Sequence, residues 1–446
     1  MISVETRQLT IEAAWLAAQT GGHPAALWRL PKAKEKQLLI DLSDQDRRGK
    51  LDLEEASPGF ALGPFLNPDG QQTRTLRADL YFRFDSGSEL LEEQTSPSAD
   101  RRWVLEFEDS LRKEVLPFPP LSSVRFNQQW PTAYATEPPQ EEADDNTRFS
   151  ESVRLAVEAI EAGQFKKVVL SRTKQVVLPA NFSVVAAFNR LCDSYPNAFV
   201  SAVSLPDEAA VWLGATPETL VSVDAAGLFR TVSLAGTQSA YDANGDLLRP
   251  VDARWSHKEI EEQAHVSRYI IECFKKIRLR EYVENGPKTV QAGNLMHLRT
   301  DYVVDAQAVG FPQLGTIMLD LLHPTSAVCG TPKAPAMKFI QAHEGYDREW
   351  YSGFLGPVNI GGESHLFVNL RTMKVTTNVV ATDFSPSTTG PTTSQPGNGL
   401  TSVATTFATL YAGAGITEDS VPEKEFQETE LKCQTLLSVI GGGANH

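Results

Sequence analysis

The chain has 446 residues, of which 41% are hydrophobic and 22% are charged, a composition typical of globular proteins. Its formal net charge of −15 makes nucleic acid and anionic membrane surfaces poor partners. The same charge repels a small dianionic substrate, so a site for such a ligand has to carry its own positive groups.

The four cysteines (Cys192, Cys273, Cys329 and Cys433) are widely spaced and form no CxxC pair. This spacing argues against a disulfide framework or a zinc site and favours a reducing compartment. The first residues lack a basic segment followed by an apolar one, and no window approaches 18 uninterrupted apolar residues. We therefore expect a cytoplasmic protein that does not span a membrane.

Residues 1–133 mix short alternating segments with turn signals, and we find no chemical motif among them. Within this part, residues 75–85 alternate apolar and polar side chains and predict one strand. Residues 134–147 are rich in proline and acidic residues and predict an exposed linker. Apolar residues then recur at helical spacing from Phe149 to Ile160, which predicts a helix that ends near Gly163.

From Lys167 onward, predicted strands alternate with a few long amphipathic helices. Residues 167–172 (KVVLSR) predict a buried strand. Because no GxGxxG motif follows a strand, antiparallel sheets with helices outside are favoured over a doubly wound parallel sheet. Residues 376–406 contain a run rich in Ser, Thr, Pro and Gly, which predicts a mobile loop inserted between two strands.

Two predicted helices carry glutamates three residues apart. Residues 256–259 (SHKE) and 420–423 (SVPE) both have the pattern of a capping box. The first helix places Glu259 and Glu262 on one face, and the second does the same for Glu425, Glu428 and Lys432. Like charges three residues apart repel, and a divalent cation between the helices would offset that cost. The spacing alone is equally compatible with two solvated helix surfaces.

Other residues of catalytic interest have ordinary structural interpretations when each is taken alone. Lys167 at the edge of its strand could extend to water, and Glu218 follows a Thr-Pro turn. His297 lies in an apolar run, and Arg371 ends a predicted strand at 366–371. The glycines of residues 411–416 (YAGAGI) fit either close approach to a ligand or close packing of a strand.

Taken together and in order, these motifs resemble the chorismate-utilising enzymes and, among them, the isochorismate synthases. The matching series is KVVLSR (167–172), GATPE (214–218), SLAGT (233–237), KEIEE (258–262), MHL (296–298), LLHPTSAVCG (321–330), EGYDREWYSG (344–353), NLRT (369–372), YAGAGI (411–416) and ETELK (428–432). The resemblance covers roughly residues 148–440. It implies an α/β (α+β) fold like that of anthranilate synthase component I, with four layers (α/β/β/α) and two antiparallel sheets, in which residues 1–133 supply framework.

The resemblance also implies a role for each motif residue. Lys167 matches the general base that activates water, and Glu218 matches the general acid. The residues that match a Mg²⁺ site are Glu262 and Glu428, with Glu259 and Glu425 as outer-shell partners. The residues that match the substrate pocket are Arg371, Lys432, Tyr351, His297, Thr325, Ala327, Gly236, Thr237 and Gly413. The implied reaction is reversible: water adds at C2 of chorismate and the C4 hydroxyl leaves.

Position 167 distinguishes the subfamilies best, because enzymes that use water carry lysine there and anthranilate synthases typically carry glutamine. Ala235 stands where aminodeoxychorismate synthases place a nucleophilic lysine, and residues 266–270 depart from the anthranilate synthase pattern. A salicylate synthase, which goes on to eliminate pyruvate, is the main alternative. A non-catalytic chorismate-binding or amidotransferase-partner subunit is another. The resemblance implies a monomer without a glutaminase subunit, serving menaquinone, siderophore or salicylate biosynthesis.

Overall fold

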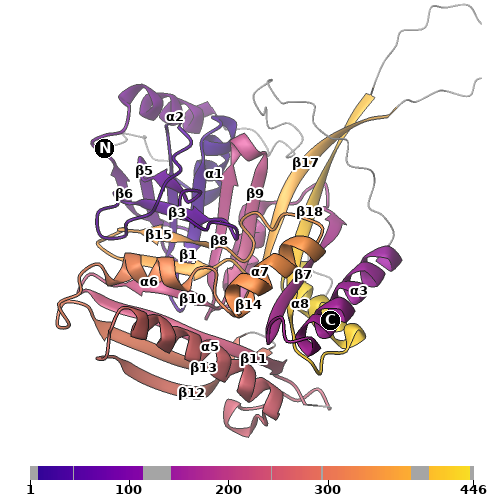
Figure 1. The fold of residues 1–446 in the computed structure, drawn as a ribbon. Coiled ribbons are helices and arrows are strands. Elements are labelled where there is room, and N and C mark those ends of the chain that lie inside the picture. The colour runs from indigo at the N-terminus through magenta and orange to yellow at the C-terminus, as the bar shows by residue number, and fades with distance from the viewer. Residues whose placement is uncertain are drawn as a thin grey trace, which may run out of the picture.

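The computed structural model describes residues 9–43, 45–113, 142–242, 244–292, 295–382 and 401–441. These residues form two β-sheets with helices packed on their outer faces (Figure 1). Every strand pairing within the two sheets of this described part is antiparallel. The predicted architecture of two antiparallel sheets between helical layers is confirmed, and the doubly wound alternative is excluded.

The larger sheet has ten strands in the described residues. Their order is β14 (Gly330–Thr331), β7 (Lys167–Val177), β18 (Thr401–Ile416), β17 (Thr372–Thr382), β9 (Ala210–Thr216), β8 (Phe199–Leu205), β1 (Ala25–Arg29), β2 (Lys36–Ile40), β5 (Leu80–Phe84) and β6 (Leu90–Thr95). The helices packed on this sheet are α1 (Ile11–Thr20), α3 (Glu142–Glu161), α4 (Val184–Ser194), α7 (Lys333–His343) and α8 (Pro422–Ile440). Helix α2 (Arg101–Lys113) packs on α1.

The smaller sheet has eight strands in the described residues. Their order is β12 (Val283–Ala292), β13 (Leu295–Asp305), β11 (Leu228–Ser239), β10 (Thr219–Val223), β16 (Ser364–Val368), β15 (Phe354–Val358), β3 (Gly59–Gly63) and β4 (Arg74–Arg77). Helices α5 (His257–Lys276) and α6 (Leu314–Leu322) pack on this sheet, and two short 3₁₀ turns, η2 (Pro206–Glu208) and η3 (Pro250–Asp252), lie in connections.

Buried aromatic side chains join the two sheets. Phe199 of the larger sheet stacks on Phe367 of the smaller one with ring centroids 4.1 Å apart. Trp28 of the larger sheet contacts Phe60 of the smaller one in a tilted arrangement, with ring centroids 5.4 Å apart. Burying an aromatic side chain of this size stabilises a fold by about 1.5–3 kcal/mol. The faces of the sheets are therefore held at a fixed spacing close to the residues that line the cavity described below.

The N-terminal part (residues 9–113) contributes strands to both sheets. The single strand predicted at 75–85 is wrong, because these residues form β4 in the smaller sheet and β5 in the larger one. The strand is interrupted near Asp79, a fully buried residue. Its carboxylate accepts a hydrogen bond from the Leu42 amide at 3.0 Å and pairs with Arg77 at 2.5 Å. A buried charge needs such donors, which here are the neighbouring Arg77 side chain and the Leu42 amide from an earlier part of the chain.

Two predicted segment boundaries need correction. Helix α3 begins at Glu142, so the residues from 142 to 147 are helical rather than linker, and residues 134–141 lie outside the described part. Gly163 follows α3 with φ of 75°, as expected of a helix-terminating glycine. Strands β17 and β18 stay paired out to Thr382 and Thr401 in a long hairpin (Figure 1). Residues 376–382 and 401–406 are therefore strand, and residues 383–400 are not described.

The two predicted capping boxes have different outcomes. At the start of α5, the Glu259 carboxylate accepts a hydrogen bond from the Ser256 amide at 2.8 Å, which confirms the first. The second is wrong, because α8 has Val421 as its N-cap and Pro422 at its first position. Ser420 Oγ instead accepts a hydrogen bond from the Thr417 amide at 3.1 Å and closes the preceding turn.

Within the described residues, no helix combines the length and the apolar composition that crossing a bilayer requires. All four cysteines are buried free thiols. The sequence spacing had argued against a disulfide framework.

Candidate active site

One cavity between the two sheets collects most of the residues singled out in the sequence. Its walls come from β7 and β18 of the larger sheet, from β11 and β13 of the smaller sheet, and from α5 and α8. The predicted site residues that line it are Glu218, Glu262, Glu428, Arg371, Lys432, Tyr351, His297, Ala327, Gly236, Thr237 and Gly413. Residues up to about 260 positions apart in the chain therefore meet in one place.

Lys167 and Glu262 form an ion pair at this cavity. Lys167 begins β7, its side chain is only 5% exposed, and Nζ donates to Glu262 Oε1 at 2.7 Å. This burial excludes the alternative in which Lys167 extends to water. Burial alone would raise the pKa of Glu262, but the charge and the hydrogen bond of Lys167 outweigh it and hold this pKa below its ordinary value.

Gly415 of β18 lies directly against this ion pair. A Cβ at this position would be 2.9 Å from Lys167 Cε and 3.1 Å from Glu262 Oε1. The glycine-rich run at 411–416 is thus both a packed strand and a wall of the cavity. The sequence interpretation named Gly413 and missed Gly415, although alternation along the strand places both on the same face.

Glu218 is the buried carboxyl of the site. It lies in the turn between β9 and β10 and is 5% exposed. Burial raises its pKa to about 7, an effect that the charges of Lys167 and Arg371 only partly oppose. Near neutral pH, a large fraction of Glu218 is therefore protonated and able to donate a proton.

Helix α8 presents an ion pair of its own. Lys432 Nζ donates to Glu428 Oε1 at 2.6 Å and to the Gly413 carbonyl at 2.6 Å. The second bond ties α8 to β18 at the cavity wall. The i, i+4 spacing on the helix thus brings one carboxylate and one cation to the site together.

Arg371 does not end a strand, as the sequence suggested. Strand β16 ends at Val368, and Arg371 occupies a bend before β17 with φ of 49°. Its carbonyl accepts a hydrogen bond from the Ala215 amide at 3.1 Å, which fixes the bend against β9. Left-handed backbone is unfavourable for a non-glycine residue, and such strain is concentrated at functional sites.

His297 is a neutral member of the cavity wall. Its Nδ1 lies 3.2 Å from Thr237 Oγ1 and 3.2 Å from the Gly236 carbonyl oxygen. Burial, assisted by the charge of Arg371, lowers its pKa to about 3. Gly236 has φ of 73°, and a Cβ there would lie 3.1 Å from Glu259 Cβ. A larger residue at position 236 would therefore be strained and crowded.

Four predicted site residues are not among those that line the cavity. Lys167 lies against two residues that do line it, Glu262 and Gly415. Glu259 caps its own helix, and Glu425 pairs with Lys258 at 3.3 Å across α8 and α5. Thr325 is buried beside the cavity wall, and its Oγ1 has no hydrogen-bond partner in the described part of the chain. Across the described residues, no three His, Cys, Asp or Glu side chains form a metal-binding group.

Comparison with known proteins places these features in a family. The sequence pattern of the chorismate binding enzymes matches residues 121–382 and 401–441. The salicylate biosynthesis isochorismate synthase of Pseudomonas aeruginosa is 30% identical over 311 residues, which cover 67% of this chain and 56% of that protein. Isochorismate synthase EntC of Escherichia coli is 27% identical over 304 residues, which cover 67% of this chain and 68% of that protein.

Solved structures have the same fold. MenF, the menaquinone-specific isochorismate synthase of Escherichia coli, matches with a TM-score of 0.69 and 21% identity, over 99% of this chain and 97% of that chain. Anthranilate synthase component I of Streptococcus pneumoniae matches with a TM-score of 0.58 and 17% identity, over 98% and 94%. The structural match extends through the N-terminal part, whereas the sequence match to the Pseudomonas aeruginosa protein spans little more than half of that protein. The family match covers more than half of the chain, so this protein belongs to the chorismate binding enzymes.

Proposed function

We propose that this protein is an isochorismate synthase that converts chorismate reversibly to isochorismate. The observation that carries the proposal is the pairing of roles at one cavity. Glu218 is a buried carboxyl with a pKa of about 7, and Lys167 is a buried amine held by Glu262. A proton donor that lines the cavity, and a candidate base paired with a carboxylate of its wall, suit the addition of water at one carbon and the departure of the hydroxyl, as water, at another.

Each step has a residue to perform it. Lys167, in its neutral amine form, would accept a proton from the water that attacks C2, and Glu218 would donate its proton to the C4 hydroxyl, which leaves as water. Arg371 and Lys432, both at the cavity wall, would counter the two carboxylates of chorismate. These two cations supply the local positive field that a chain with a net charge of −15 has to provide for a dianion.

Glu262 and Glu428 are the residues that would hold Mg²⁺. Both carboxylates line the cavity, whereas Glu259 and Glu425 are engaged elsewhere. Two carboxylates fit Mg²⁺, which is commonly bound by one or two protein carboxylates and completed by waters and substrate oxygens. Bound there, the ion would supply positive charge to an anionic group of the substrate.

A second candidate is a salicylate synthase, which would continue from isochorismate by eliminating pyruvate. It would use the same lysine, acid and metal residues, so the cavity described above accommodates it equally. The pathway is a further proposal, namely menaquinone, siderophore or salicylate biosynthesis. The Pseudomonas aeruginosa relative is named for salicylate biosynthesis, MenF of Escherichia coli for menaquinone and a Vibrio cholerae enzyme for vibriobactin. We also propose a cytoplasmic monomer. Because water replaces ammonia, no glutaminase subunit is needed.

The test is to incubate the purified protein with chorismate, with and without Mg²⁺, and to separate the products by chromatography. Isochorismate formed only with Mg²⁺, in equilibrium with chorismate and without pyruvate, is the expected result. Salicylate with pyruvate would support the second candidate. Unchanged chorismate in every condition would refute both. Lys167→Ala and Glu218→Gln should each reduce turnover by a factor of about 10² to 10⁴.

A further inference from the structure

The segment that carries Tyr351 is held between two strained residues. Glu349 has φ of 51° and Ser352 has φ of 60°, so left-handed backbone flanks Trp350 and Tyr351 on both sides. Each such non-glycine residue costs about 1–3 kcal/mol. Both Tyr351 and Ser352 line the cavity. The segment therefore needs anchors outside its own backbone to keep Tyr351 in place.

Three side chains from elsewhere in the chain provide these anchors. Asn369 Nδ2 donates to the Trp350 carbonyl at 2.9 Å, and Lys374 Nζ donates to Glu349 Oε2 at 2.6 Å. The third is Glu208 of η2, whose Oε2 accepts the indole Nε1 hydrogen bond of Trp350 at 2.9 Å. Trp350 is 4% exposed and packs in the core between the sheets, so this hydrogen bond fixes a large buried ring.

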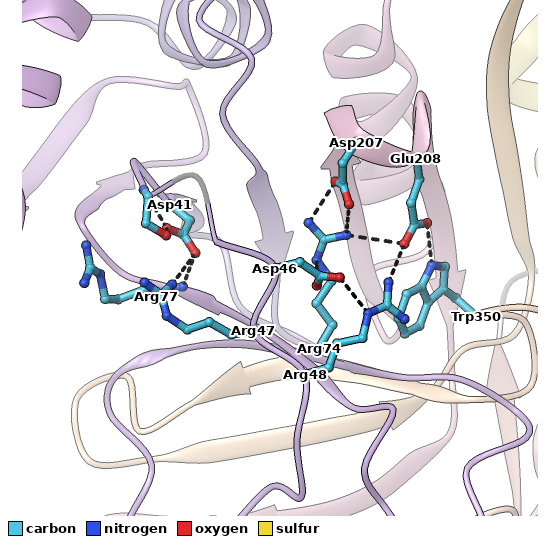
Figure 2. Close-up of polar contacts among 10 residues, drawn as sticks. Asp41, Asp46, Arg47, Arg48, Arg74, Arg77, Asp207, Glu208 and Trp350 are labelled. Atoms are coloured by element: carbon cyan, nitrogen blue, oxygen red, sulfur yellow. Dashed lines mark hydrogen bonds and ion pairs between the residues drawn. The ribbon is translucent and has the colours of Figure 1, made fainter. Parts of the chain in front are cut away.

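Glu208 is itself held by two arginines of the N-terminal part, as Figure 2 shows. Arg74 Nη1 lies 3.3 Å from Glu208 Oε1, and the same guanidinium makes two 2.8 Å bonds to Asp207. Arg48 Nη2 lies 3.4 Å from Glu208 Oε1, and its guanidinium sits 5.6 Å from the centroid of the Trp350 ring. The Arg74 side chain is only 3% exposed, so its charge depends on these carboxylates.

We propose that Glu208 is a positioning residue for Tyr351, and that Arg74 and Arg48 give the N-terminal part its influence on the substrate site by holding Glu208. Glu208 acts through the Trp350 indole and not by contact with substrate. The inference rests on the proposed function, in which the cavity that Tyr351 lines binds chorismate. Loss of the hydrogen bond between Glu208 and Trp350 should weaken substrate binding more than it slows the chemical step.

Three variants separate the indole hydrogen bond from the rest of the network. Glu208→Leu removes the acceptor, Trp350→Phe removes the donor N–H together with part of the buried indole ring, and Glu208→Gln keeps an acceptor oxygen. Asp207→Asn is the matched control, because Asp207 also binds Arg74 while the indole hydrogen bond goes to Glu208. We expect KM for chorismate to rise about five- to twentyfold in Glu208→Leu and Trp350→Phe, with kcat within about threefold of the parent.

The conservative and control variants complete the test. Glu208→Gln should recover KM to within about threefold, and Asp207→Asn should leave KM unchanged even if it lowers the melting temperature. The double variant Glu208→Leu/Trp350→Phe should be no worse than either single one, because both remove the same bond. Normal KM values in both single variants, or full additivity in the double variant, would overturn the inference.

Failure of the proposed function is distinguishable from failure of the inference. If the parent protein does not convert chorismate, the proposed function fails. The positioning role is then decided by a crystal structure of Trp350→Phe. This variant keeps an aromatic ring at position 350, so it remains usable even if Glu208→Leu does not fold. Displacement of Tyr351 and Ser352 relative to the parent supports the role, and unmoved residues refute it.

Discussion

Glu218→Gln should make the protein more stable at alkaline pH while it removes most of the activity. Burial raises the pKa of Glu218 from an ordinary 4.5 to about 7, so the folded protein disfavours the charged carboxylate. A difference of one pKa unit corresponds to about 1.4 kcal/mol, which gives a cost of about 3 kcal/mol once Glu218 is fully ionised. Glutamine has a similar shape and carries no charge at any pH.

The sign of the effect fixes its pH window. A carboxyl group whose pKa is raised in the folded state has no effect on stability below about pH 4.5. Between about pH 4.5 and pH 7 the free energy of unfolding falls progressively, and above about pH 7 the full cost of ionising the buried group applies. The variant should therefore exceed the parent by about 3 kcal/mol in free energy of unfolding at pH 8.5. At pH 4.5 the difference from this source should be no more than about 0.5 kcal/mol.

Urea unfolding at the two pH values measures this difference directly, and Glu55→Gln, at an exposed carboxylate, serves as the control. The control should change the free energy of unfolding by no more than about 0.5 kcal/mol at either pH. An equal stability change in Glu218→Gln at both pH values would show that burial of the charge is not its cause. Chorismate turnover in the same variant should fall by a factor of about 10² to 10⁴.

Three other predictions test separate parts of the structure. Gly415→Ala should lower kcat at least about tenfold, because the new methyl would lie 2.9 Å from Lys167 Cε; an unchanged kcat would contradict this packing. The His297 ring, with a pKa of about 3, should give neutral-imidazole NMR shifts from about pH 5 to 8, and a titration there would disprove its neutrality. Arg74→Met should cost about 2 kcal/mol of unfolding free energy in urea, against at most about 1 kcal/mol for Arg83→Met at an exposed ion pair; equal losses would refute the role of burial.

The sequence predicted which residues lie together at the cavity better than it predicted the course of the backbone that carries them. The motifs around Lys167, Glu218 and Glu262 are each short and local, so their order along the chain was enough to show the resemblance to the chorismate-utilising enzymes, and that resemblance grouped the residues. Arg371 was placed wrongly because NLR continues the apolar run of β16, and nothing in that run marks a left-handed bend. The break at Asp79 was missed because the same apolar-polar alternation continues on both sides of it.

Contacts between residues far apart in the chain could not be predicted from local sequence patterns. Glu208 follows Pro206 in an ordinary turn, and its bond to Trp350 joins residues 142 positions apart. The pKa of Glu218 likewise depends on how completely the fold removes it from water. The insertion was predicted too long because Thr-rich strand residues such as Thr376 and Thr377 share the composition of the loop they lead into.

The place of β18 has a consequence for how the chain is made. It lies between β7 and β17, and it is the last strand of either sheet to be synthesised. Until β18 has been synthesised, no strand can pair with both β7 and β17, and the edges of these two strands that face each other stay unpaired. The part of the cavity wall that β18 provides, with Gly413 and Gly415, is therefore the last part to be put in place.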